Sequence, residues 1–354
     1  MNNRCSIDRF RFLALIGACA ASAAGQTDTK SDSTPAADVQ PATDTAIDAA
    51  LRLIAQFDRS AEVGAPAPLL ADLEKIVDRA KTEAAGDRRL SYVVGRWYAL
   101  SGRQGDAVTA LRKYLDTREG RNDWHAHLAL GDLFVDQFPH LALSSYDQAN
   151  GLKSDEPGVL YGLARCAEKL GRMPDALTHA RRLVDVAPTA RYRSYLARLL
   201  FAQRQYEDAE REAQGALEQA AAAQLADPSR LSSALEIDGY YKLLLDMRQM
   251  RLAENPADAD RYVAVAQLIG ERAKQSQRTA MMEAVEVLRR GMENLKSDPP
   301  ISLREALAIA LDEAGRTDEA RAEFEAIRKA DPTHAVAAQW LARLMPGETP
   351  PPIP

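Results

Sequence analysis

The chain has 354 residues, of which 46% are hydrophobic and 27% charged, so it is long enough for a large core and typical of a soluble globular protein. Its formal net charge of −6 argues against nucleic-acid binding over the whole surface. Aromatic residues make up only 6%, so the core must be built mainly from Ala and Leu, which favour close helix packing over a β-sandwich.

The first 25 residues have the features of an export signal. Arg4, Arg9 and Arg11 give a basic start, and an apolar stretch that begins at Phe12 runs into small residues. This stretch is too short for a comfortable transmembrane helix. Residues 1–25 therefore predict a signal peptide and export from a bacterial cell.

Two processing routes remain open for this signal. The segment 16–19, Ile-Gly-Ala-Cys, resembles a bacterial lipobox, in which Cys19 would be lipidated and become the new N-terminus. Small residues at Ala21 and Ala23, or at Ala23 and Gly25, suit ordinary signal peptidase instead. The expected location is the periplasm, either as a free protein or as a membrane-tethered lipoprotein.

The two ends of the mature chain contrast with its body. Residues 26–45 are polar and rich in Thr, Asp, Ser, Ala and Pro, which predicts a disordered linker. Residues 46–87 carry apolar side chains at helical spacing and predict an N-terminal helical cap or a divergent repeat. Residues 346–354 are too rich in proline for a helix and are expected to form a tail.

An internal repeat dominates the body of the chain. A turn of the form Gly-Arg-x-x-acidic-Ala begins at Gly102, Gly171 and Gly315, and the same turn without its glycine begins at Arg204. Such a period indicates stacked supersecondary units, because one unit cannot bury its own apolar face. The alanines that open the second helix of successive units lie 35, 34 and 33 residues apart: Ala107, Ala142, Ala176 and Ala209.

These residues and this period resemble the tetratricopeptide-repeat family. The pattern fits four repeats over residues 88–217, and two repeats plus a capping helix over 258–345. It fails over 218–257, where 231–252 is predicted as one long helix within an irregular helical insertion. The resemblance implies an all-α fold, a right-handed superhelical solenoid of antiparallel helix hairpins, with an irregular long helix in the middle.

No enzymatic motif is found in the sequence. It lacks a Gly-rich phosphate loop, a Gly-x-Ser-x-Gly elbow and a His-Glu-x-x-His zinc helix. His125 and His127 are two residues apart on a predicted helix and point to roughly opposite faces, so they do not suit a shared metal. Cys166 lies in an apolar helical pattern and is expected to be a buried packing residue. We therefore expect no catalysis, no cofactor and no metal.

The resemblance implies that the first helix of each hairpin lines a concave groove that binds a protein or peptide. The predicted lining of the first four repeats has five arginines against two carboxylates, which suits an acidic peptide or a C-terminal carboxylate. In the alternative interpretation these arginines form salt bridges with neighbouring repeats or simply solvate the surface. The later repeat presents Glu305, Asp312 and Glu313 instead. The predicted groove residues are Arg89, Tyr92, Arg96, His125, Leu128, Asp132, Tyr161, Arg165, Glu168, Arg191, Arg198 and Phe201.

Three functional hypotheses follow. The first is an exported, non-catalytic scaffold whose partner is a protein or peptide, with no nucleic acid and with membrane contact only through an N-terminal lipid. The second is a lipoprotein assembly factor of an envelope or secretion complex, which lipidation at Cys19 would favour. The third is a helical carrier or an enzyme with an unrecognised site, for which a sealed apolar cavity around 231–252 or a pocket of clustered carboxylates would be the sign.

Overall fold

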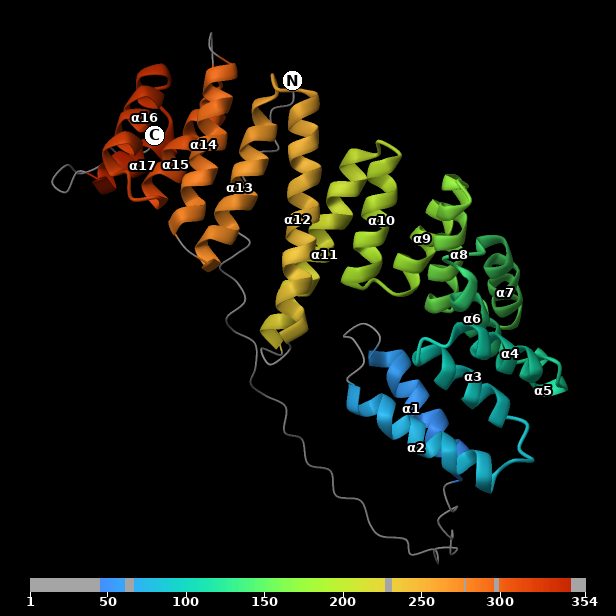
Figure 1. Ribbon diagram of the computed structural model, residues 1–354. Helices are drawn as coiled ribbons and strands as arrows, with labels where there is room; N and C mark the ends of the chain where they lie inside the picture. The colour runs from blue at the N-terminus through green and yellow to red at the C-terminus, as the bar shows by residue number, and fades with distance from the viewer. Residues whose placement is uncertain (1–44, 61–66, 227–230, 277, 296–298, 345–354) are drawn as a thin grey trace, which may run out of the picture. The chain divides into compact units, whose positions relative to one another are not determined.

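The computed structural model describes residues 45–60, 67–226, 231–276, 278–295 and 299–344 (Figure 1). Within these ranges the chain forms seventeen helices and no strand. The predicted signal peptide, nearly all of the predicted linker and the proline-rich tail lie outside the described residues. The helices are α1 (Ala46–Ser60), α2 (Ala67–Glu83), α3 (Leu90–Leu100), α4 (Gln104–Leu115), α5 (Arg118–Arg121), α6 (Trp124–Phe134), α7 (Pro139–Leu152), α8 (Pro157–Lys169), α9 (Met173–Val186), α10 (Ala190–Ala202), α11 (Tyr206–Ala226), α12 (Leu231–Glu254), α13 (Ala259–Ser276), α14 (Arg278–Asn294), α15 (Ile301–Glu313), α16 (Thr317–Ala330) and α17 (Ala335–Leu344).

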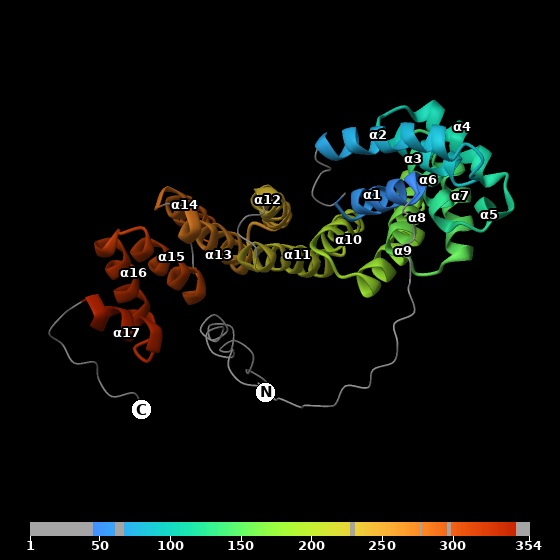
Figure 2. The ribbon, with the colours of Figure 1, turned by 90° about the horizontal axis from the view of Figure 1, so that it is seen from below.

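Most of these helices form hairpins that stack in chain order. The helices of each hairpin pack together, and the second helix of a hairpin packs on the first helix of the next, except between α11 and α13, where α12 intervenes (Figures 1 and 2). The hairpins are α1/α2, α3/α4, α6/α7, α8/α9, α10/α11, α13/α14 and α15/α16. The last helix, α17, packs on α16, where Trp340 stacks on Phe324 with ring centroids 5.5 Å apart. The all-α hairpin solenoid predicted from the sequence is confirmed.

Apart from the short α5 and the terminal α17, the helix outside these pairs is α12, the long middle helix that the sequence predicts. It packs on α11 before it and on α13 after it, but α13 forms its own hairpin with α14. Polar contacts fix α12 on both sides: Arg251 Nη1 lies 2.5 Å from Glu210 Oε1 on α11, and Arg248 Nη1 donates to the backbone oxygen of Ala264 on α13 at 2.9 Å. The repeat pattern is therefore interrupted by one helix that has no hairpin partner.

The hairpin turns explain the recurring glycine. Gly102, Gly171 and Gly315 have φ values of 76°, 71° and 80°, a left-handed conformation that disfavours a side chain. The residue after each glycine donates its N–H back to a carbonyl five residues earlier, which closes the first helix. Arg204 holds the equivalent position at φ 58° and is one of two described non-glycine residues with positive φ.

Substitution Arg204→Gly is expected to stabilise the protein. The left-handed conformation costs a side-chain-bearing residue about 1–2 kcal/mol, and glycine's greater freedom in the unfolded chain offsets part of the gain. We expect the free energy of unfolding to rise by about 0.5 kcal/mol, measured by urea titration followed by circular dichroism. Arg204→Ala is the control, because it removes the long side chain and keeps the Cβ. A variant with glycine no more stable than the alanine control would contradict the strain argument.

Glycines also allow a large ring between neighbouring hairpins. Tyr146 of α7 is fully buried, and a Cβ on Gly131 of α6 or on Gly162 of α8 would lie 2.7 Å or 2.3 Å from its ring carbon Cε1. The Tyr146 hydroxyl donates to Asp132 Oδ1 at 2.7 Å. One side chain therefore holds α6, α7 and α8 together, and only glycine leaves room for it on both sides.

Gly162→Ala should lower the free energy of unfolding by about 1–3 kcal/mol, because its methyl group would overlap the Tyr146 ring in a packed core. Gly151→Ala on α7 is the matched control, since nothing lies within 4 Å of a Cβ at that position. The control is expected to be neutral or slightly stabilising. Thermal unfolding by circular dichroism measures both; equal melting temperatures for the two variants would refute the crowding at Tyr146.

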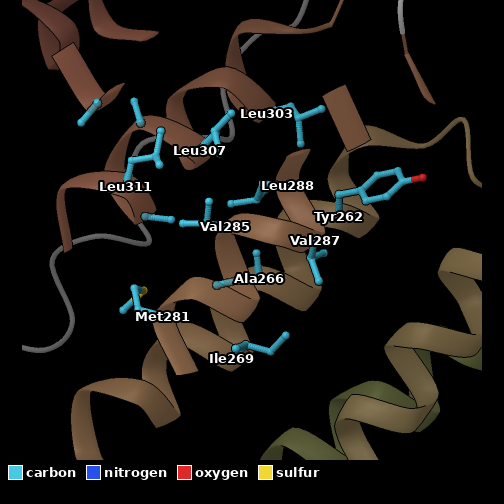
Figure 3. Close-up of a cluster of buried hydrophobic side chains, with 14 of the residues drawn as sticks. Tyr262, Ala266, Ile269, Met281, Val285, Val287, Leu288, Leu303, Leu307 and Leu311 are labelled. Carbon is cyan, nitrogen blue, oxygen red and sulfur yellow. The ribbon is translucent and has the colours of Figure 1, made fainter. Parts of the chain in front are cut away.

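The C-terminal hairpins share one apolar core (Figure 3). Leu303, Leu307 and Leu311 of α15 are buried against α14, which contributes Val285 and Leu288. The residues recur at three- and four-residue steps, so one stripe of each helix is covered. This core includes residues of α12 at its edge and ends at α17.

Candidate binding surface

The predicted groove residues lie on α3, α6, α8 and α10, the first helices of four successive hairpins. At the N-terminal end, Arg89 precedes α3 and is fully engaged by carboxylates. Its Nη2 lies 2.8 Å from Asp87 Oδ2 and its Nη1 lies 2.9 Å from Asp48 Oδ1 on α1. The hydrogen bond from Arg89 is the largest influence on the pKa of Asp87, which is lowered. Arg89 thus ties α3 to the first hairpin.

Arg96 and Arg165 are also paired. Arg96, whose side chain is 11% exposed, forms an ion pair with Asp58 of α1. Nη2 of Arg165, on α8, lies 2.9 Å from Asp136 Oδ1, and Nζ of Lys169 lies 3.2 Å from the same oxygen. For these arginines the structure agrees with the salt-bridge interpretation. Their charge is available only to a ligand that displaces a carboxylate.

Asp132, on α6, lies near both of these arginines. It is an exposed residue that accepts the hydrogen bond from Tyr146. Crowding by surrounding protein raises the pKa of Asp132, although the Tyr146 hydrogen bond and the charges of Arg96 and Arg165 act in the opposite direction. Nearby Tyr92 is buried, which raises its pKa to about 12, so its phenol stays neutral. This part of the predicted groove is an internally balanced polar cluster.

Four predicted residues and two further tyrosines form an aromatic and basic patch on α8 and α10, in which Tyr195 is buried and Tyr161 and Tyr192 are half-buried beneath the arginines. The ring of Tyr161 lies 5.1 Å from that of Tyr195 in an edge-to-face arrangement and 5.7 Å from that of Tyr192. The guanidinium carbon of Arg191 lies 5.1 Å from the Tyr161 ring centroid, and that of Arg198 lies 5.5 Å from the Tyr195 centroid. We call this set the tyrosine–arginine surface; its members are Tyr161, Arg165, Arg191, Tyr192, Tyr195 and Arg198.

Arg191 and Arg198 differ from the other predicted arginines. Both are exposed, and neither forms an ion pair with any residue that the structure describes. The ring beneath Arg198 is fixed, because the Tyr195 hydroxyl donates to Glu168 Oε2 at 2.9 Å. The surface therefore presents two guanidinium groups that rest on aromatic rings and keep their charge uncompensated.

Two further predicted residues make aromatic contacts of their own. His125 is exposed and stacks on Trp124 with centroids 3.7 Å apart, and Phe201 contacts the Tyr206 ring at 5.2 Å. The sequence interpretation missed Tyr192 and Tyr195. Tyr192, Tyr195 and Arg198 follow one another at steps of three residues on α10, and neighbours at that spacing lie close together on a helix. This spacing is the signal that would have found them.

Acidic positions predicted for the later repeat are also partnered. Glu305 Oε2 lies 3.6 Å from His334 Nε2, and Asp312 Oδ2 lies 3.9 Å from Arg343 Nη2. These distances join α15 to α17 and the turn before it. The contacts link the last hairpin to the terminal helix.

The described residues do not meet the requirements of a metal site or of a membrane span. They contain no group of three His, Cys, Asp or Glu side chains placed to hold a metal ion, and none of their helices combines the length and apolarity needed to cross a membrane. Cys166 is a buried free thiol whose pKa is raised to about 11 by burial. Cys19, the predicted lipidation site, lies outside the described residues.

One of the hairpins matches a known family. Residues 159–190, which hold most of α8, all of α9 and the turn that follows, match the family model of the tetratricopeptide repeat. No curated protein matches the chain.

Several solved structures of tetratricopeptide-repeat proteins are similar to this chain. A thermophilic protein of Thermus thermophilus is 18% identical with a TM-score of 0.41, covering 53% of this chain and 99% of its own. The C-terminal part of a Cytophaga hutchinsonii protein is 13% identical with a TM-score of 0.40, covering 83% and 99%. A protein of Parabacteroides merdae is 16% identical with a TM-score of 0.36, covering 73% and 98%.

Proposed function

We propose that this chain is a tetratricopeptide-repeat protein that acts as an exported non-catalytic scaffold and binds an acidic segment of a partner protein through the tyrosine–arginine surface. The observation that carries the proposal is the pair Arg191 and Arg198, both exposed and each resting on a tyrosine ring. Guanidinium groups of this kind bind carboxylates bidentately and tolerate stacking on both faces. The rings supply contact area at a low cost in side-chain entropy.

The spacing of the two arginines defines the partner further. They are seven residues apart on α10, which is about two helical turns and roughly 10 Å along the axis. A peptide in the polyproline II conformation has three residues per turn and advances about 3.1 Å per residue, so carboxylates three residues apart lie on one side of it and would reach both guanidinium groups. The guanidinium carbon of Arg165 lies 5.7 Å from the Tyr161 ring centroid, so Arg165 would strengthen binding once it releases Asp136.

A peptide experiment tests this function. The probe is a fluorescein-labelled, C-terminally amidated peptide, Gly-Asp-Ser-Ser-Asp-Gly, titrated with the purified protein and followed by anisotropy. Reversal of both charges, Arg191→Glu with Arg198→Glu, should weaken binding by at least about tenfold, because each loses a charge-assisted contact and gains repulsion. Binding should also fall with added salt.

The matched control reverses two exposed arginines elsewhere, Arg118→Glu with Arg211→Glu, so that the net charge changes equally. The control should bind like the wild type. Equal weakening of peptide binding in both double variants would mean that the overall charge of the protein, and not this site, determines binding. Undiminished binding by Arg191→Glu with Arg198→Glu would rule out the tyrosine–arginine surface as the site.

We propose ordinary signal-peptidase cleavage after Ala23 or Gly25 as the export route, on the basis of the small residues there. The substitution Cys19→Ser should then leave processing and the soluble fraction unchanged when the full chain is expressed in a bacterium. The mass of the mature protein measures the cleavage position. A membrane-bound product with a lipid mass, lost in Cys19→Ser, would instead support the lipoprotein route and with it the assembly-factor hypothesis.

A further inference from the structure

The interrupted repeat at α12 leaves a cleft that none of the preceding functions uses. The cleft has a volume of about 370 Å³ and is formed by the end of α12, by α13 and by α14. Within the described residues, α12 packs on α11 and on α13, whereas α13 forms its hairpin with α14. The cleft thus lies where the regular pairing of helices is interrupted.

The floor of the cleft is apolar and preformed. Val265 and Val287 are 1% and 4% exposed, and half-buried Leu252 completes the floor from α12. Figure 3 shows Val287 and Tyr262 on the helices that carry the C-terminal core. The ring of Tyr262 forms a wall. A Cβ on Gly291 would lie 2.8 Å from that ring, so the ring packs directly against the backbone of α14.

Hydrogen bonds hold this wall in place. The Tyr262 hydroxyl donates to the backbone oxygen of Pro256 at 3.1 Å and accepts from Asn294 Nδ2 at 2.6 Å. Asn294 and Gln249 both line the cleft and are exposed, so their side-chain amides stand at its rim. Side-chain amides of this kind pair with the main chain of an extended peptide.

The rim also carries one uncompensated charge. Arg290 is exposed and lines the cleft, and it forms no ion pair within the part of the chain that the structure describes, even with Glu286 and Glu293 on the same helix. A ligand that combines an apolar group with a single negative charge would satisfy both the floor and Arg290. The volume is at the small end of ligand sites, which suits one or two side chains better than a long lipid chain.

We propose that this cleft binds the C-terminal residue of a partner polypeptide. The apolar terminal side chain occupies the floor of Leu252, Val265 and Val287, and the terminal carboxylate pairs with Arg290. The amides of Gln249 and Asn294 bind the peptide main chain. This site shares no residue with the tyrosine–arginine surface, so the two bind independently.

The test uses fluorescein-labelled hexapeptides of alternating Gly and Ser that end in Leu, Ile or Phe, each as the free acid and as the amide. We expect at least one free acid to bind saturably, and its amide to bind about tenfold more weakly for want of the charge-assisted contact. Ala253→Trp fills the cleft from an exposed position and should abolish binding. Met250→Trp, exposed on the same helix and outside the cleft, is the matched control and should bind normally.

A charge variant separates the two parts of the site. Arg290→Gln should weaken the free acid about tenfold and leave the amide unchanged. Arg191→Glu with Arg198→Glu should leave both unchanged, so failure at one site is distinguishable from failure at the other. The proposal is overturned if no free acid of the panel binds, if acid and amide bind equally, or if Ala253→Trp binds like Met250→Trp. Binding of dodecanoate without binding of any peptide would also overturn it, in favour of a carrier of fatty acids.

Discussion

The close approach of helices around Tyr146 is the contact on which the N-terminal part of the solenoid depends. A tyrosine ring fills the space between three helices, and it fits because α6 and α8 present glycine at the two points of contact. Its hydroxyl would be costly to bury without a partner, and Asp132 supplies one. The same packing therefore fixes both a core contact and the position of a carboxylate on the face that carries Arg96 and Arg165. The position of the Asp132 carboxylate therefore depends on how closely the backbones of α6 and α8 approach α7.

The structure also explains why α12 could not be recognised as part of a repeat. Leu244 and Met247 belong to the core shared with α10 and α11, whereas Leu252 packs against the C-terminal core. A helix that buries apolar residues on two sides loses the single stripe by which a repeat is recognised. It keeps the two stacks in contact without a hairpin partner. Continuity of the apolar core is thus preserved where the regular pattern is lost, and the end of the helix lines the cleft.

Much of the fold could be predicted from the sequence, because its determinants are local. The turn at Gly102 needs a positive φ, and the alanines at a period of about 34 residues mark helix crossings, so both are visible as a pattern. The partners of the arginines are not visible in this way. Arg89, Arg96 and Arg165 bind carboxylates 41, 38 and 29 residues away in the sequence.

A repeat pattern indicates the face on which a side chain lies, but it does not give the rotamers that decide which neighbour it meets. Of the five arginines predicted to line the groove, only Arg191 and Arg198 have no carboxylate partner among the described residues. The tyrosines beneath them were missed for a related reason. Tyr195 is a buried core residue of α10 and Tyr192 is half-buried, and only the packing of α10 against Tyr161 of α8 brings the three rings together.

The arginines of the tyrosine–arginine surface differ in how much affinity each would contribute to an acidic ligand. A ligand that binds Arg165 must first displace Asp136, so the gain from the new ion pair is offset by the loss of the old one. Arg191 and Arg198 are restrained by ring contacts instead, and a ring does not neutralise the charge that a carboxylate would meet. Part of the entropy cost of ordering a long side chain has already been met in the free protein. In a chain whose net charge is −6, two restrained and uncompensated guanidinium groups two turns apart on one helix are therefore the position at which an acidic partner gains most.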